Sequence, residues 1–186
     1  MLQLCSRVSD NLMRIKDMKM KKGLMKFGIV MFLTLSLVGC GLGNAFNSSR
    51  VYETEDFSIE MMTGMTKVDY EGYNYLFQNL SEETMILVLE ESFEFIGIDD
   101  SYTIEDYLGM VIQANGLAEG SIMKDEATGL SYVTFESTVE GESYSYLMFA
   151  TKTDTSFWLF QIGCLTADYS ENQATLLEWA NSVVMK

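Results

Sequence analysis

The cysteine thiols are the side chains of this sequence with the most reactive chemistry. The three cysteines are Cys5, Cys40 and Cys164, and the chain of 186 residues has no histidine. A thiol attacks substrates or binds metals as the thiolate, and histidine is the base that most often ionises it. Cys164 ends an apolar run, 157–164, that is typical of a buried strand. We therefore expect Cys164 to be an inert core thiol.

Carboxylates are concentrated in one short segment. Asp99-Asp100-Ser101 is followed by Glu105 and Asp106. Oxygen ligands suit a hard cation such as Ca²⁺, but the spacing departs from the EF-hand, which needs acids at alternating positions and a closing glutamate. The same acids also suit the start of a helix capped by Thr103, because the helix dipole favours negative charge there. We interpret them as helix-capping residues, with calcium binding as the alternative.

Three methionines lie close together at Met61, Met62 and Met65. Their thioether groups are soft ligands that could hold copper(I). Methionine is also an adaptable filler of hydrophobic cores. We favour the core interpretation.

Since the sequence has no nucleophile elbow, phosphate-binding glycine loop or paired-cysteine metal site, we expect no enzyme activity and no cofactor.

Tyrosines are grouped at two places in the chain. Where such rings are exposed they are natural anchors of protein interfaces, although many pack across neighbouring strands instead. The candidate interface residues are Tyr70, Tyr73, Tyr75, Tyr144 and Tyr146.

The patterns of apolar residues predict the elements that position these side chains. Alternation and apolar runs predict strands at 51–54, 57–61, 73–77 and 85–89, followed by a meander at 121–125, 129–138, 142–152 and 157–165. Apolar residues at helical spacing predict one helix from Thr103 to Gly116, with an inner face formed by Ile104, Tyr107, Leu108, Val111 and Ile112. This content predicts an α+β fold with a mostly antiparallel sheet of about six or seven strands flanked by helices.

A second amphipathic helix is predicted at the end of the chain. Ser170-Glu171-Asn172-Gln173 has the sequence of a capping box, which would begin the helix. Its expected inner face is formed by Leu176, Leu177, Ala180, Val183 and Val184, with Trp179 nearby.

Residues 51–186 resemble the PsbP/Mog1-like α/β/α sandwich. The resemblance is carried by Asp56-Phe57-Ser58-Ile59, Thr103-Ile104-Glu105-Asp106-Tyr107, Gly129-Leu130-Ser131-Tyr132 and Leu177-Glu178-Trp179-Ala180. Members of this family act as accessory or binding modules of larger assemblies, so the resemblance implies a non-catalytic role. It transfers no functional residue, and the absence of proline departs from many members.

The N-terminal segment has the composition of a secretory signal. Lys19, Lys21, Lys22 and Lys26 precede an uncharged apolar run at 27–36, which is too short to span a bilayer comfortably. The next residues, Leu37-Val38-Gly39-Cys40, resemble the lipobox of bacterial lipoproteins. The resemblance implies that Cys40 takes a thioether-linked diacylglyceryl group and becomes the first mature residue. The alternatives are an ordinary signal peptide or a membrane helix.

These features divide the chain into three parts. Residues 1–39 are the expected signal peptide, in which residues 1–17 suggest an over-extended start. Residues 40–49 are the expected lipidated cysteine and flexible tether, and 50–186 are expected to form one α+β domain. The anchored domain would lie on the extracytoplasmic face of the cell membrane, because two acyl chains together hold a protein stably to a bilayer.

The mature part of the chain is strongly acidic. Seven of the 12 basic residues and two of the 27 acidic residues precede Cys40, so 5 basic and 25 acidic residues remain, a net charge of −20. This charge excludes nucleic acid as a partner and disfavours electrostatic attachment to anionic lipids.

Two functions remain open. The first is a membrane-anchored module that binds another surface protein through exposed aromatic residues. The second is an exported protein that binds a small ligand or a cation. A deep pocket with converging polar groups would favour the second function, and an exposed apolar patch would favour the first.

Overall fold

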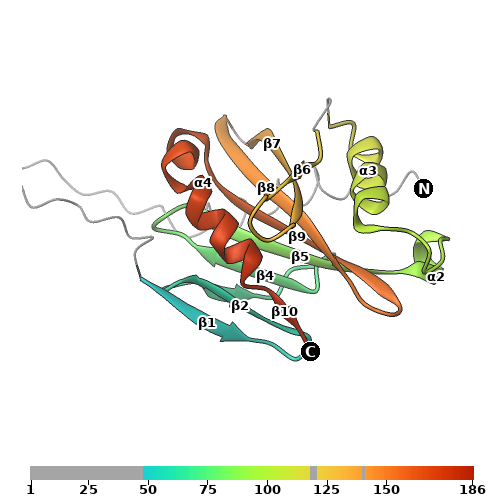
Figure 1. Cartoon of the computed structure of the whole chain (residues 1–186). Helices are drawn as coiled ribbons and strands as arrows, with labels where there is room; N and C mark the ends of the chain where they lie inside the picture. The colour runs from blue at the N-terminus through green and yellow to red at the C-terminus, as the bar shows by residue number, and fades with distance from the viewer. Residues whose placement is uncertain (1–47, 118–120, 140) are drawn as a thin grey trace, which may run out of the picture.

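The computed structural model describes residues 48–117, 121–139 and 141–186, and Figure 1 shows how their elements are arranged. Within these ranges the chain forms two antiparallel sheets and three helices. The strands are β1 (Ser49–Glu53), β2 (Phe57–Met62), β3 (Thr66–Val68), β4 (Tyr75–Asn79), β5 (Thr84–Ser92), β6 (Met123–Lys124), β7 (Ser131–Val139), β8 (Glu142–Lys152), β9 (Ser156–Leu165) and β10 (Val184–Met185). The helices are α2 (Phe93–Ile96), α3 (Ile104–Ala114) and α4 (Thr166–Asn181).

The larger sheet has seven strands in the order β3-β4-β5-β9-β8-β7-β6. Strands β8 and β9 are joined by a tight turn in which the Thr153 N–H donates to the Ser156 carbonyl at 2.9 Å. Every residue of β9 except Leu165 is buried, because β5 and β8 flank it and both faces of the sheet are covered. The meander predicted from residue 121 onward is confirmed, and β8 has the predicted bounds.

The smaller sheet has three strands in the order β1-β2-β10. Phe57, Ile59 and Met61 of β2 are fully buried, whereas Glu60 is exposed. The alternation predicted for this strand is therefore confirmed. β10 comes from the C-terminal end of the chain and pairs with β2 through Val184 and Ser58.

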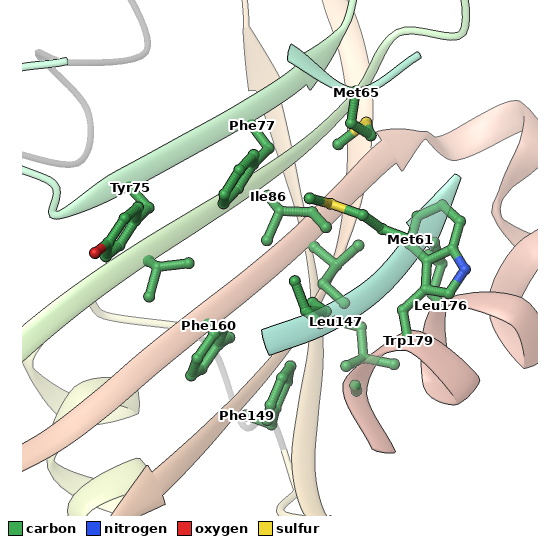
Figure 2. Packing of buried hydrophobic residues seen from close by; sticks show 14 of the residues in the cluster. Met61, Met65, Tyr75, Phe77, Ile86, Leu147, Phe149, Phe160, Leu176 and Trp179 are labelled. Carbon is green, nitrogen blue, oxygen red and sulfur yellow. The ribbon is translucent and has the colours of Figure 1, made fainter. Parts of the chain in front are cut away.

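The main hydrophobic core lies between the smaller sheet, α4 and one face of the larger sheet. Figure 2 shows Met61 beside Trp179 and Leu176 of α4, with Phe149 and Phe160 of the larger sheet close by. The rings of Phe149 and Phe160 stack with centroids 4.9 Å apart. This layer is built almost entirely from apolar side chains, so its stability comes mainly from apolar burial and close packing.

The opposite face of the larger sheet is covered by α3. Its inner residues, Tyr107, Leu108 and Val111, are buried against β7, β8 and β9. The Tyr107 ring stacks on that of Phe157, with centroids 4.4 Å apart. Helices therefore pack on both faces of the sheet, which confirms the predicted α+β fold and its α/β/α layering.

The start of α4 differs from the prediction. The helix begins at Thr166, directly after β9, and its N-cap residue Leu165 makes no side-chain capping bond. Ser170 consequently lies inside the helix, where Asn172 is buried. The capping-box interpretation was wrong because the chain turns from strand to helix without a loop.

The end of α4 also differs from the prediction. The helix ends at Asn181, so Val183 and Val184 do not belong to its inner face. Val184 is 61% exposed in β10, whereas Leu176 and Ala180 are buried as predicted. Strand pairing with β2 takes the place of a last helical turn.

Candidate functional site

The short helix α2 was not predicted, and it forms one end of the domain. Ser92 caps its start by accepting from the Phe95 N–H at 3.3 Å. Gly97 ends it in the left-handed conformation, with φ of 74°, and donates its N–H to the Phe93 carbonyl at 2.9 Å. The buried ring of Phe93 holds the turn against the sheet. These contacts fix a single helical turn at both ends.

Two aromatic rings are exposed at this end of the molecule. Phe95 is 73% exposed and Tyr102, in the loop between α2 and α3, is 37% exposed. Phe95 is the most exposed of the large apolar residues in the described part of the chain; Val51, Leu80 and Val184 are less exposed. We refer to residues 93–103 together with the β8–β9 turn, 153–155, as the α2 end.

Lys152 holds the loop that carries Tyr102. Its ammonium group donates to the Asp100 carbonyl at 2.5 Å and to the Tyr102 carbonyl at 3.0 Å. The same ammonium lies 5.6 Å from the centre of the Phe93 ring. Because Lys152 ends β8, the position of the loop is tied to the rigid sheet.

Of the carboxylates predicted as helix caps, Asp106 has this role. The Thr103 hydroxyl accepts from the Asp106 N–H at 3.1 Å, and the Asp106 carboxylate accepts from the Thr103 N–H at 3.0 Å. The capping box is thus complete. Hydrogen bonds from Thr103 hold the pKa of Asp106 below its usual range.

Asp99 and Glu105 also have local partners. The Asp99 carboxylate accepts from the Ser101 hydroxyl at 2.5 Å, and this bond is the main cause of its lowered pKa. Glu105 accepts from the Ser131 hydroxyl at 2.7 Å and pairs with Lys124 at 3.8 Å. The acids of segment 99–106 are thereby directed to different neighbours. Within residues 48–117, 121–139 and 141–186, no group of three histidine, cysteine or acidic side chains could hold a metal ion.

A buried carboxyl group lies beneath α3, next to the α2 end. Glu91 of β5 is 4% exposed, and the Tyr107 hydroxyl donates to its Oε2 at 2.5 Å. Its other oxygen, Oε1, is buried without a hydrogen-bond partner among the described residues. Desolvation raises the pKa of Glu91, although the bond from Tyr107 opposes the shift. Burial also raises the pKa of Tyr107, with the Glu91 charge adding to the effect.

Sequence reasoning missed Glu91, although a signal was present. Glu90 and Glu91 end an apolar strand, and neighbouring residues in a strand point to opposite faces. When one face of that strand is covered at this position, one of the two acids must point inward. Glu90 is the exposed one, and its carboxylate accepts from the Ser156 hydroxyl at 2.9 Å.

The structure buries three of the five predicted interface tyrosines. Tyr75 is 8%, Tyr144 6% and Tyr146 1% exposed, so these three candidates follow the alternative given for them, packing between strands. Their rings are used in packing, as when Tyr146 stacks on Phe135 with centroids 4.9 Å apart.

The remaining two tyrosines of that set are partly accessible. Tyr70 and Tyr73 are half-buried and stack on each other at 6.1 Å. Desolvation raises the pKa of Tyr73 to about 12. An interface at these two residues stays a prediction.

The other singled-out residues belong to the core or lie outside the described ranges. Met61, Met62 and Met65 are buried in the main core. Cys164 is free and buried, and desolvation raises its pKa to about 11, as expected for an inert core thiol.

The N-terminal segments singled out above lie outside the described residues. They are Cys5, Leu37-Val38-Gly39-Cys40 and the tether up to residue 47. No helix in the described ranges is long and apolar enough to cross a membrane.

The chain enters the domain at the end opposite to α2. Ser49 pairs with Met62, and the Met62 sulfur lies 3.9 Å from the side-chain nitrogen of Asn79. Asn79 pairs with Thr84, the first residue of β5. Helix α2 begins directly after Ser92, the last residue of β5, and so lies at the other end of this strand. Nine residues of antiparallel strand span about 27 Å. Figure 1 shows the same arrangement, with β1 beginning on one side of the molecule and α2 on the other.

Comparison with known proteins gives a likeness in structure only. No family model and no curated protein matches the sequence. The solution structure of cyanobacterial PsbP (CyanoP) from Synechocystis sp. PCC 6803 has a TM-score of 0.52 and 17% identity, over 82% of this chain and 99% of that one.

Two further structures are similar at lower scores. A protein from Bacteroides thetaiotaomicron has a TM-score of 0.49 and 14% identity, over 70% of this chain and 45% of that one. LpqN from Mycobacterium tuberculosis, involved in cell envelope biogenesis, has a TM-score of 0.44 and 6% identity, over 75% of this chain and 91% of that one. The likeness to CyanoP carries the conclusion that this chain has a PsbP-like fold.

Proposed function

We propose that the protein is a non-catalytic binding module, held by a lipid on Cys40 at the extracytoplasmic face of the cell membrane, and that it docks on another protein through the α2 end. The observation that carries the proposal is the 73% exposure of Phe95 on a helical turn fixed by Ser92 and Gly97. A large exposed ring on a fixed backbone is an effective anchor, because the chain that carries it need not be ordered when the ring enters a pocket.

The position of the α2 end supports a docking role for an anchored protein. Residues 40–48 would form a short tether of roughly 15–18 Å root-mean-square length. The α2 end lies about 27 Å further on, at the far end of β5 from Thr84. Phe95 would therefore be within reach of proteins that stand above the membrane surface.

The anchoring part of the proposal is tested by replacing the acceptor thiol. We expect wild-type protein in the membrane fraction, released by detergent but not by salt, with a diacylglyceryl mass on Cys40. The Cys40→Ala variant should lack this mass. Wild-type protein with an unmodified Cys40, or wild-type protein in the soluble fraction, would contradict the anchor.

The docking part is tested with paired surface variants in the same membranes. Phe95→Ser should lose a chemically cross-linked partner that wild type retains. Val184→Ser removes an apolar side chain of similar exposure, 61%, from the smaller sheet and serves as the matched control. Loss of the partner in both variants, or in neither, would argue against docking through the α2 end.

A further inference from the structure

We propose that the α2 end fits a partner protein with an apolar socket rimmed by lysine and arginine. This inference rests on the proposed function and deepens it by naming the chemistry of the partner. It depends on the charges around Phe95, which the docking proposal itself does not use.

Exposed acids lie on each of the segments that form the α2 end. Glu94 is exposed next to Phe95 on α2, and Asp99 and Asp100 are exposed in the following loop. Asp154 is exposed in the β8–β9 turn, which lies against α2 because the Phe93 N–H donates to the Thr155 carbonyl at 3.0 Å. The α2 end thus carries four exposed carboxylates, which we call the rim.

One cation, Lys152, is present at this end of the described chain, and its charge, which helps to lower the pKa of Asp99, offsets only part of the charge of the four acids. The Lys152 ammonium is turned to the backbone carbonyls of Asp100 and Tyr102. Four carboxylates against one ammonium leave the α2 end with a negative potential. A partner surface with lysine and arginine would complement this potential, whereas an acidic surface would be repelled.

The other four basic residues of the domain are engaged elsewhere. Lys124 pairs with Glu105 at 3.8 Å, and Lys186 pairs with Glu53 at 2.7 Å. Arg50 lies over the Tyr52 ring at 4.3 Å, and Lys67 over the Tyr75 ring at 4.4 Å. None of these contacts places positive charge beside Phe95.

The same charges argue against a lipid surface as the occupant. Cytoplasmic membranes carry anionic lipids, which attract basic segments and repel acidic ones. Four carboxylates at the α2 end would oppose insertion of the Phe95 ring among such headgroups. A basic protein socket satisfies both the apolar and the charged parts of the α2 end.

The test is a photo-cross-link from the full-length chain in its own membranes. A benzophenone amino acid replaces Phe95 in one version and Val184 in the other, and the partner peptide is sequenced. We expect an adduct from position 95 alone, at an apolar site flanked by lysine or arginine. Charge reversal by Glu94→Lys with Asp154→Lys should lower its yield at least about tenfold.

The matched control reverses two exposed acids far from the rim, Glu171→Lys with Glu178→Lys on α4, and should leave the yield unchanged. An adduct that survives reversal of Glu94 and Asp154 would overturn the basic socket while leaving docking through Phe95 intact. An adduct with lipid, or none at all from position 95, would overturn both this inference and the docking proposal.

Discussion

The two faces of the seven-stranded sheet are covered in different ways. The face under α4 and the smaller sheet is closed by fully buried apolar residues such as Phe57, Ile59 and Leu176. The face under α3 contains a buried carboxyl group, Glu91, and continues into the exposed ring of Phe95. One face thus contributes mainly to stability, whereas the other has polar and exposed groups that packing alone does not explain.

This contrast predicts a large loss of stability when a large side chain is removed under α4, and almost none when the Phe95 ring is removed at the α2 end. A truncation under α4 leaves a cavity in a close-packed core. A truncation at Phe95 removes a ring that is already in water. The predictions below test this division, from the largest expected change in stability to the smallest.

The largest effect is expected for Trp179→Ala on α4. Trp179 is 2% exposed in the main core, so its truncation should lower the free energy of unfolding by about 3–5 kcal/mol. Urea unfolding followed by circular dichroism measures the change. A loss below about 1 kcal/mol would mean that the α4 face is not the stabilising one.

A smaller loss is expected for Gly163→Ala in β9. A Cβ atom there would lie 2.5 Å from Cε1 of Tyr146, so the ring must shift at a cost of about 1–3 kcal/mol. The control is Gly109→Ala in α3, where a Cβ meets no atom within 4 Å and alanine should stabilise the helix by about 0.5–1 kcal/mol. Equal unfolding midpoints for both variants would contradict the close contact of Tyr146 with Gly163.

The buried acid predicts a dependence of stability on pH. Because the pKa of Glu91 is raised in the folded state, the folded protein retains this proton at pH values where the unfolded chain has released it. Its contribution to stability is complete below the unfolded pKa and is lost as pH rises through the folded pKa. The slope from this one proton is at most about 1.4 kcal/mol per pH unit.

Glu91→Gln should remove this part of the pH dependence, because the amide has no proton to lose and can still accept from Tyr107. Unfolding of both proteins between pH 4 and 8 measures the effect. We expect the difference in stability to shift in favour of Glu91→Gln as pH rises. A constant difference across this range would show that Glu91 does not titrate between the two states.

The smallest change in stability is expected for Phe95→Ser. Its ring is 73% exposed, so the free energy of unfolding should stay within about 0.5 kcal/mol of wild type. Thermal and urea unfolding measure it. A loss comparable to that of Trp179→Ala would assign Phe95 to the core and remove the distinction between the two faces.

Local patterns predicted the regular parts of the fold well. The capping residue Thr103, the apolar stripe of α3 and the bounds of β8 follow from contacts between residues close in sequence or across one hairpin. Elements that depend on distant partners were missed. β10 forms because Val184 meets Ser58 across most of the chain, and its two residues carry no periodicity of their own.

The candidate site was harder to predict than the fold, for a physical reason. The sequence shows where the tyrosines lie in the chain, but it does not show which rings are buried. Burial depends on tertiary packing, which covered Tyr75, Tyr144 and Tyr146. Phe95 lies on a single helical turn that is too short to show a period. Its exposure follows from the fixed positions of Phe93 and Gly97, which only the folded chain reveals.

The central claim is that binding and stability lie in different parts of the molecule, and one measurement tests it most directly. The Phe95→Ser protein is compared with wild type in the same membranes, and both the unfolding midpoint and recovery of the cross-linked partner are recorded. The account predicts an unchanged midpoint, an unchanged membrane fraction and loss of the partner. A folded, anchored Phe95→Ser protein that still recovers the partner at the wild-type level would contradict it.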